Sequence, residues 1–321
     1  LIMTTYKEIR GTNIEAVASD PSNPVEGQVW YNTTTNVVKG FFINTGSWST
    51  GGALNSGRES STGIGTQAAA IVAGGGPGLL VESYSGTNWT EVNDLNTARQ
   101  RLSSGGTPTS ALVFAGRTPA PSTTGATETW NGTNWTEVSD LNTARENGAG
   151  AGASSTNGLF FGGDPVVAIT ELYNGSNWTE VNNMNNARGT FNACGASNSA
   201  VLAVGGKEVP SSGDKTELWN GTNWTEVNDL SGASRYGSGV AGITTSALIF
   251  GGFSGASNLT ESWNGTNWTA VTAMSQGRAT PAGAGKSNGS ALATGANGPS
   301  ATSAKTEEWD AGPTTLTFDV S

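Results

Sequence analysis

The sequence contains no histidine and a single cysteine, Cys194. The absence of histidine excludes Ser-His-Asp catalysis, histidine general bases and histidine metal ligands. A lone cysteine excludes an intrachain disulfide and a zinc site built from thiolates, and its setting among small and apolar residues favours a buried thiol. We therefore expect no metal and no cofactor, and only enzymes that work with carboxylates stay open.

Charged residues are also scarce. They make up 12% of the chain, the net charge is −10, and no cluster of Lys or Arg stands out. Because phosphate binding needs concentrated positive charge, we expect no nucleic-acid partner. No apolar run reaches about 18 residues, and the first ten residues lack the apolar stretch of a signal peptide, so we expect no membrane insertion. The 11 tryptophans argue against the disorder that 47 glycines would otherwise suggest.

The chain is rich in one repeated phrase, an aromatic residue followed by Asn-Gly-Thr-Asn-Trp-Thr-Glu-Val or a close variant. Its tryptophan recurs at positions 89, 135, 178, 224 and 268. A fixed period of this size indicates a repeat protein. We expect these tryptophans to be structural, because large indoles that recur once per repeat pack between repeats: Trp89, Trp135, Trp178, Trp224 and Trp268.

One repeat contains four short strand patterns and no helical periodicity. A small polar stretch runs from Arg99 to Gly106, and an apolar run covers 110–116. Residues 127–130 and 135–138 each alternate polar and apolar side chains. Asn131-Gly132 between them predicts a two-residue hairpin turn. Four strands in a repeat of this length predict a β-propeller blade.

Three further marks each occur six times, which predicts six blades. The repeats carry an arginine, a glycine and a Glu-x-aromatic pair, with the arginine at Arg58, Arg99, Arg145, Arg188, Arg235 and Arg278. The last-strand tryptophan occurs only five times after Arg58, and the missing copy is predicted at Trp48, upstream of all the others. The strand near Trp48 would then close the sixth blade, although residues 314–320 also read as a strand that competes for this place.

The order of these marks resembles the kelch repeat. Gly162-Gly163, Tyr173 and Trp178 reproduce its di-glycine, aromatic and tryptophan. Ala115-Gly116 and Thr294-Gly295 depart from it, because each lacks the glycine pair. The resemblance covers roughly residues 41–310. It implies a propeller, often with a binding role, and it names no ligand. Together with the six marks, the sequence predicts an all-β, six-bladed kelch-like propeller with four-stranded blades over 41–321.

Residues 1–40 do not repeat and form a predicted N-terminal arm with a β-hairpin. Two strand patterns, 28–32 and 37–42, flank a Thr/Asn turn. The segment from Pro21 to Asn32 resembles an N-terminal segment of tail and appendage proteins of marine bacteriophages. That resemblance implies attachment to a virion, with Trp30, Tyr31 and Lys39 as candidate docking residues. A hairpin that simply packs on the propeller is the plainer interpretation.

Related propellers include enzymes, but the sequence favours none of them. Galactose oxidase needs histidine around its copper, and this chain has none. The sialidase Asp-box is only loosely matched by residues 129–135, where Asn replaces Asp and the spacing is short. A carboxylate-based glycosidase is the weakest alternative, because no non-repeating acidic pair stands out. We therefore predict no catalytic residues.

The repeated arginines have two interpretations. Each precedes an inner strand, so all should lie at one level. They could form a ring of positive charge that attracts an anionic glycan. We favour a structural role for Arg99, Arg145, Arg188 and their counterparts, in which each binds carbonyls or the glutamate of a nearby Glu-x-aromatic pair.

Function is better sought where the repeats vary. Four irregular segments, 117–126, 164–168, 207–214 and 253–258, join the second and third strands of their blades and should share one face. Candidate ligand-binding residues within them are Arg117, Asp164, Lys207, Asp214 and Phe253.

The sequence thus predicts a non-enzymatic bacteriophage virion protein, on a tail, fibre or capsid. Its arm would bind other virion proteins, and its propeller would face outward to bind a host-surface glycan or to decorate the particle. It would be made in the host cytoplasm and reside in the virion. The alternative is a cellular kelch-like adhesion or protein-interaction module.

Overall fold

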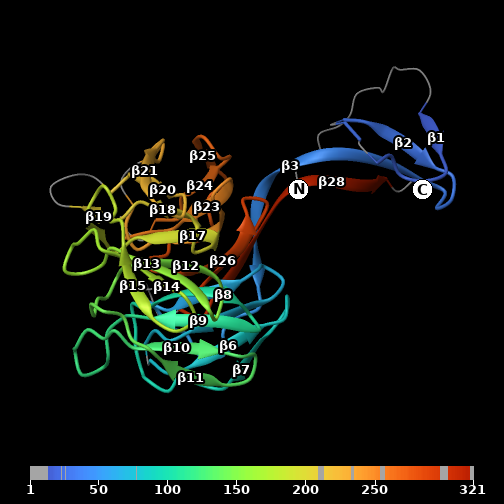
Figure 1. Ribbon diagram of the computed structural model, residues 1–321. Helices are drawn as coiled ribbons and strands as arrows, with labels where there is room; N and C mark the ends of the chain where they lie inside the picture. Colours follow the sequence, from blue (N-terminus) through green and yellow to red (C-terminus); the bar gives the residue numbers. More distant parts are fainter. Residues whose placement is uncertain are drawn as a thin grey trace. The chain divides into compact units, whose positions relative to one another are not determined.

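The computed structural model describes residues 14–318, apart from 23, 26, 77, 209–212, 233–234, 254–256 and 297–302. Every regular element in this part of the chain is a strand, which confirms the predicted all-β class (Figure 1). The same residues include no helix long and apolar enough to cross a membrane. The chain forms two compact units, one of residues 1–45 and 311–321 and the other of residues 46–310.

The larger unit consists of four-stranded antiparallel sheets, whose strands we number from inside to outside. The inner strands are β4 (Thr62–Gly65), β8 (Ser103–Thr107), β12 (Ala149–Ser154), β17 (Asn192–Ser197), β22 (Gly239–Ile243) and β26 (Ala282–Ser287). The second strands are β5 (Ala70–Ala73), β9 (Ser110–Phe114), β13 (Asn157–Phe161), β18 (Ala200–Val204), β23 (Ser246–Phe250) and β27 (Ser290–Thr294).

The third strands are β6 (Val81–Tyr84), β10 (Thr127–Trp130), β14 (Thr170–Tyr173), β20 (Thr216–Trp219), β24 (Thr260–Trp263) and β28 (Thr306–Phe318). The outer strands are β7 (Trp89–Val92), β11 (Trp135–Val138), β15 (Trp178–Val181), β21 (Trp224–Val227), β25 (Trp268–Val271) and β3 (Val37–Gly51). The four strand patterns read from one repeat are therefore all present.

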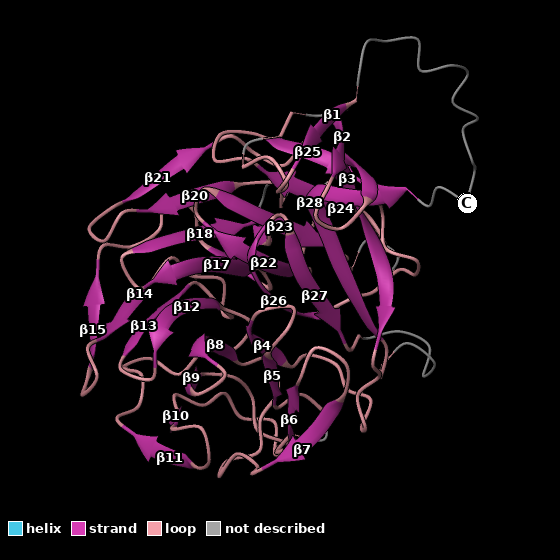
Figure 2. Cartoon of the chain, turned by 90° about the vertical axis from the view of Figure 1, so that its right-hand side faces the viewer, coloured by secondary structure: helices cyan, strands magenta, loops and turns pink. Residues whose placement is uncertain are grey.

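The inner strands lie side by side in chain order, and β26 again lies next to β4. Figure 2 shows them gathered around the middle of the larger unit, with β7, β11, β15 and β21 at its periphery. The second strands carry the apolar runs and are buried on both faces, as in Ala111–Phe114. The core therefore lies between neighbouring sheets, where the second and third strands of one face those of the next.

The sheet that contains both ends of the described chain has the order β1-β2-β3-β28-β27-β26, with β1 at Glu15–Val17 and β2 at Val29–Asn32. Trp48 lies in β3, which neighbours β28 in this sheet, and its ring lies 5.4 Å from that of Trp309. The competing segment 314–320 is no separate strand as far as Phe318, because it continues β28; residues 319 and 320 lie outside the described residues.

The outer-strand tryptophans join neighbouring sheets. Each indole N–H donates to the hydroxyl of a threonine that begins the third strand of the preceding sheet, at 3.0–3.1 Å: Trp48 to Thr260, Trp89 to Thr306, Trp178 to Thr127, Trp224 to Thr170 and Trp268 to Thr216. Trp135 differs, because the equivalent position in β6 is Val81. Its buried indole nitrogen consequently has no hydrogen-bond partner.

The repeated arginines are buried and paired with the glutamates of the third strands. In five pairs Nη2 and Oε1 lie 2.5–2.9 Å apart: Arg99–Glu128, Arg145–Glu171, Arg188–Glu217, Arg235–Glu261 and Arg278–Glu307. Arg58 pairs with Glu82 in the same way. A guanidinium that is at most 4% exposed and already paired cannot attract a ligand, so the interpretation as a ring of free positive charge is wrong.

The predicted two-residue hairpin turn is also wrong. Trp130 pairs with Trp135, which leaves a loop of four residues, 131–134. Only Gly132 adopts a positive φ. The Asn131 side chain accepts hydrogen bonds from the backbone N–H groups of Thr133 and Asn134, both at 2.9 Å, so it caps a wider loop instead of occupying a tight turn.

The smaller unit is organised around Asp20. β1 and β2 pair in parallel, and β2 and β3 form the predicted antiparallel hairpin. The Asp20 carboxylate accepts hydrogen bonds from the Trp30 indole (3.0 Å), the Asn32 amide (2.8 Å) and the Lys39 ammonium (2.7 Å). These bonds, led by the one from Lys39, lower the pKa of Asp20 from 3.8 to about 2.

Candidate functional site

The inner strands surround an axial channel, and most of the residues that line it are glycine, alanine and serine. The strands approach so closely that larger side chains would clash. A Cβ on Gly105 would lie 2.6 Å from the backbone nitrogen of Gly152, and one on Gly63 would lie 2.5 Å from the carbonyl oxygen of Gly283. The inner strands are therefore made of small residues because there is little space around the axis.

One end of this channel is encircled by residues that follow each repeated arginine by two positions. They adopt left-handed φ values of 49–59°: Ser60, Arg101, Asn147, Thr190, Gly237 and Thr280. Five backbone hydrogen bonds of 2.7–3.1 Å join successive members from Ser60 to Thr280. Non-glycine residues rarely adopt this conformation, and here the hydrogen-bonded ring holds them in it.

Outside this ring lies a second set of positions, which we call the crown pairs. In five repeats, the residue that follows the repeated arginine pairs through its backbone with the residue that follows the di-glycine position, which ends at residue 75, 116, 163, 206 or 252. The crown pairs are Glu59–Gly76, Gln100–Arg117, Glu146–Asp164, Gly189–Lys207 and Tyr236–Phe253. Four of the five predicted ligand-binding residues, namely Arg117, Asp164, Lys207 and Phe253, therefore occupy one equivalent position in successive repeats.

Ring and crown together line a pocket of about 270 Å³. Its walls are Ser60, Arg101, Asn147, Thr190 and Thr280 from the ring and Glu59, Gln100, Lys207, Tyr236 and Phe253 from the crown. The rings of Tyr236 and Phe253 stack at 5.4 Å with an interplanar angle of 21°. Tyr236 is 38% exposed, so part of this aromatic surface is open to a ligand.

Charged groups border the pocket on its other side. Glu146 lies 3.3 Å from Arg101 and 3.9 Å from Arg117, and both arginine side chains are about one-third exposed. The Asn147 amide donates to the Asp164 carboxylate at 2.7 Å. Arg117 and Asp164 thus stand next to the pocket without lining it.

Asp214, the fifth predicted ligand-binding residue, lies apart from this pocket. It is half-buried, and its carbonyl accepts a hydrogen bond from Leu230 at 3.0 Å. Parts of two predicted loops, 209–212 and 254–256, lie outside the described residues. The binding roles of all five residues stay predictions.

The sequence interpretation missed Tyr236 and the ring. The signal for Tyr236 was its position: the residue after each repeated arginine is Glu59, Gln100, Glu146, Gly189, Tyr236 or Ala279, so it varies as much as the loops do. No sequence signal predicts the ring, because threonine rarely adopts the positive φ that Thr190 and Thr280 have here.

The predicted docking residues lie in the hairpin of the smaller unit. Trp30 is fully buried and bonded to Asp20, so it stabilises the hairpin and presents no surface to a partner. Tyr31 is half-buried and its hydroxyl donates to Asn36 at 3.1 Å, while Lys39 is paired with Asp20. Docking through Tyr31 and Lys39 stays a prediction.

The larger unit offers little conventional catalytic chemistry among its described residues. They contain no group of three or more Cys, Asp or Glu that could hold a metal ion. Burial raises the pKa of Cys194 to about 12, so this thiol is protonated at neutral pH and is no nucleophile. The predicted lack of enzymatic activity itself stays untested.

Comparison with known proteins supports the fold but identifies neither a ligand nor an activity. No family model matches the chain, and no curated protein matches it. A solved structure described as "Structure of YjhT" is similar, with 12% sequence identity over 83% of this chain and 96% of that one, and a TM-score of 0.64. At this identity the likeness concerns the fold alone, which is a β-propeller.

Proposed function

We propose that the larger unit is a six-bladed kelch-like propeller whose sixth blade joins both ends of the chain. The six repeats of the arginine–glutamate pair support this count. The hydrogen bond from Trp48 to Thr260, at 3.1 Å, supports the closure, because it repeats the bond that every threonine-linked blade makes to its predecessor.

We further propose that this propeller is non-enzymatic and binds a glycan in the pocket between ring and crown. The stacked pair Tyr236–Phe253, of which Tyr236 is exposed and Phe253 half-buried, carries the proposal. The apolar face of a sugar packs on such aromatic rings, and its hydroxyls bond to the Ser, Thr, Asn and Gln side chains opposite.

We also propose that the protein is part of a bacteriophage virion. The resemblance of residues 21–32 to phage appendage proteins supports the proposal. The smaller unit would attach to other virion proteins, and the propeller would bind a glycan on the host surface. A chain that lacks residues 1–40 should then fold but fail to join particles, and assembly of this shortened chain would contradict attachment through the arm.

A glycan array with three proteins tests the binding proposal. We expect the wild-type chain to bind a defined set of glycans and Tyr236→Ala to bind them about tenfold or more weakly, because the stacking surface is lost. Leu259→Ala is the control: this side chain is 50% exposed on the neighbouring loop and does not line the pocket, so binding should be unchanged. Undiminished binding by Tyr236→Ala would refute this pocket as the site.

A further inference from the structure

The end of the channel away from the crown contains one break in the repeat pattern. Eight positions after each repeated arginine (278 to 286 in the last repeat), the inner strands carry a small or apolar residue in five repeats and a lysine in the sixth. The positions are Thr66, Thr107, Ala153, Ala196, Ile243 and Lys286. Since the other five repeats fold with a neutral residue at this position, the blade does not need a charge there.

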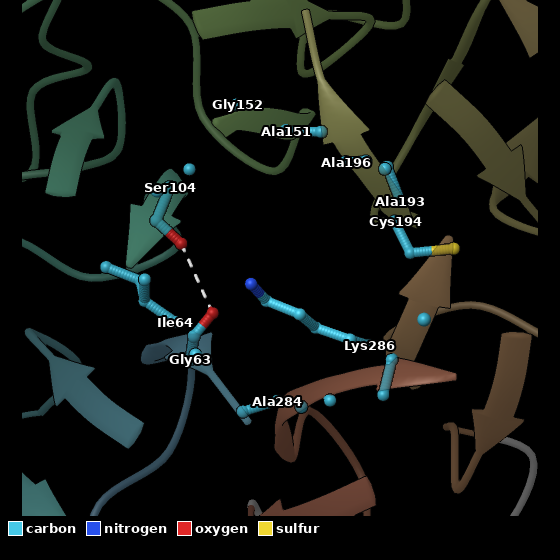
Figure 3. A pocket seen from close by; sticks show the side chains of 18 of the residues that line it. Gly63, Ile64, Ser104, Ala151, Gly152, Ala193, Cys194, Ala196, Ala284 and Lys286 are labelled. Carbon is cyan, nitrogen blue, oxygen red and sulfur yellow. Dashed lines mark hydrogen bonds between the residues drawn. The ribbon is translucent and has the colours of Figure 1, made fainter. Parts of the chain in front are cut away.

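Lys286 lines a cavity of about 160 Å³ in the channel, and it is exposed, so this cavity is open to solvent. Figure 3 shows its side chain reaching from β26 into the middle of this cavity, toward the side formed by Gly63 and Ser104. Lys286 is the only charged residue among those that line it. The ion pairs among the described residues do not include Lys286, so its ammonium has no carboxylate partner there.

The walls of the cavity can complete an anion site. Each inner strand is the edge of its sheet, so its backbone N–H and C=O groups that do not pair with the second strand point toward the channel. Most of the lining is glycine and alanine, with Ser104 and Thr107 as hydroxyl side chains and Ile64, Cys194, Val240 and Ile243 as the larger apolar ones. The N–H groups among them can donate to the oxygen atoms of an anion that the Lys286 ammonium attracts.

We propose that this cavity binds a small oxyanion, such as a carboxylate, phosphate or sulfate group, with Lys286 as its counter-charge. The volume admits a group of this size and excludes a whole oligosaccharide. The chain has a net charge of −10, so anions are repelled in general and attraction must come from a local cation. This site is separate from the pocket between ring and crown, and it does not depend on glycan binding there.

NMR titration of the full-length protein at low ionic strength tests the proposal. Inorganic phosphate and acetate are the probes, and glycerol is the neutral control. We expect saturable shifts of the amide signals of Ala196, Ile243 and Gly285 with both anions and none with glycerol. Lys286→Gln should weaken binding about tenfold or more, and Lys286→Arg should retain it.

Lys305→Gln is the matched control, because this lysine bonds to Gln276 at 3.0 Å and lies outside the cavity. Its anion binding should equal that of the wild type. The proposal is overturned if Lys286→Gln binds phosphate as tightly as the wild type does, if glycerol produces the same shifts, or if no channel amide shifts saturably in the wild-type protein. Amide spectra of the variants establish that each is folded.

Discussion

At the scale of single residues, the repeats are most informative where they differ. Tyr236, Val81 and Lys286 each stand at a position whose equivalents in other repeats are of another type. Each departure has a local consequence: an exposed aromatic surface, an indole without a partner, and a cation in a neutral channel. Departures from the repeat therefore mark both proposed binding sites and the unpartnered indole of Trp135.

Val81→Thr should stabilise the protein by about 1 kcal/mol, because a hydroxyl at this position gives the buried indole nitrogen of Trp135 the partner that other blades provide. The reverse change in a neighbouring blade, Thr127→Val, should destabilise by about 1–3 kcal/mol by removing the partner of Trp178. Urea denaturation measures both. A destabilised Val81→Thr would contradict this explanation.

The smaller unit should respond to acid through Asp20. Its folded-state pKa of about 2 lies below the ordinary value of 3.8, so its contribution to stability is full above pH 3.8 and is lost as the pH falls toward 2. Trp30 fluorescence reports this change, because its indole donates to Asp20. In Asp20→Asn the transition over this pH range should be absent; an unchanged acid transition would show that another group causes it.

At the scale of elements, each blade is held by one buried charged network. Glu128 accepts hydrogen bonds from Arg99 and from the backbone and side chain of Asn96, and Arg99 also donates to the carbonyl of Ala126. The network joins the segment before the inner strand to the third strand of the same sheet. This explains why arginine and glutamate recur together.

Glu128→Gln should destabilise the protein by about 3–5 kcal/mol, because it leaves the buried guanidinium of Arg99 without its counter-charge. Glu180→Gln, an exposed position on outer strand β15, should change stability by less than about 0.5 kcal/mol. Thermal unfolding followed by circular dichroism compares the two. Equal effects of both changes would show that the buried pair is not what stabilises the blade.

Many of the strands could be predicted from the sequence, because the same strand pattern recurs in every repeat. The four strands and the paired glutamates both follow from the repeated marks. The loop after Trp130 was mispredicted because Asn131 caps through its side chain, an alternative that the Asn-Gly pair does not distinguish. The ring was not predictable for another reason: it brings together residues from six repeats that are adjacent only around the axis.

At the scale of the whole molecule, the proposed closure joins the first described strand of the propeller to its last blade. Trp48→Ala should destabilise by about 3 kcal/mol, because it removes the bond to Thr260 and the ring contacts with Phe250 and Trp309. Hydrogen exchange should become faster in β27 and in residues 306–310 of β28. Tyr31→Ala, in the smaller unit, is the control and should leave these amides unchanged.

The glycan-binding proposal at the pocket between ring and crown is the central claim, and a crystal structure of the full-length protein with the strongest array ligand tests it most directly. The account predicts sugar density against Tyr236 and Phe253, with hydroxyl contacts to the ring residues. Density on the outer strands or in the smaller unit, with this pocket empty of sugar, would contradict it.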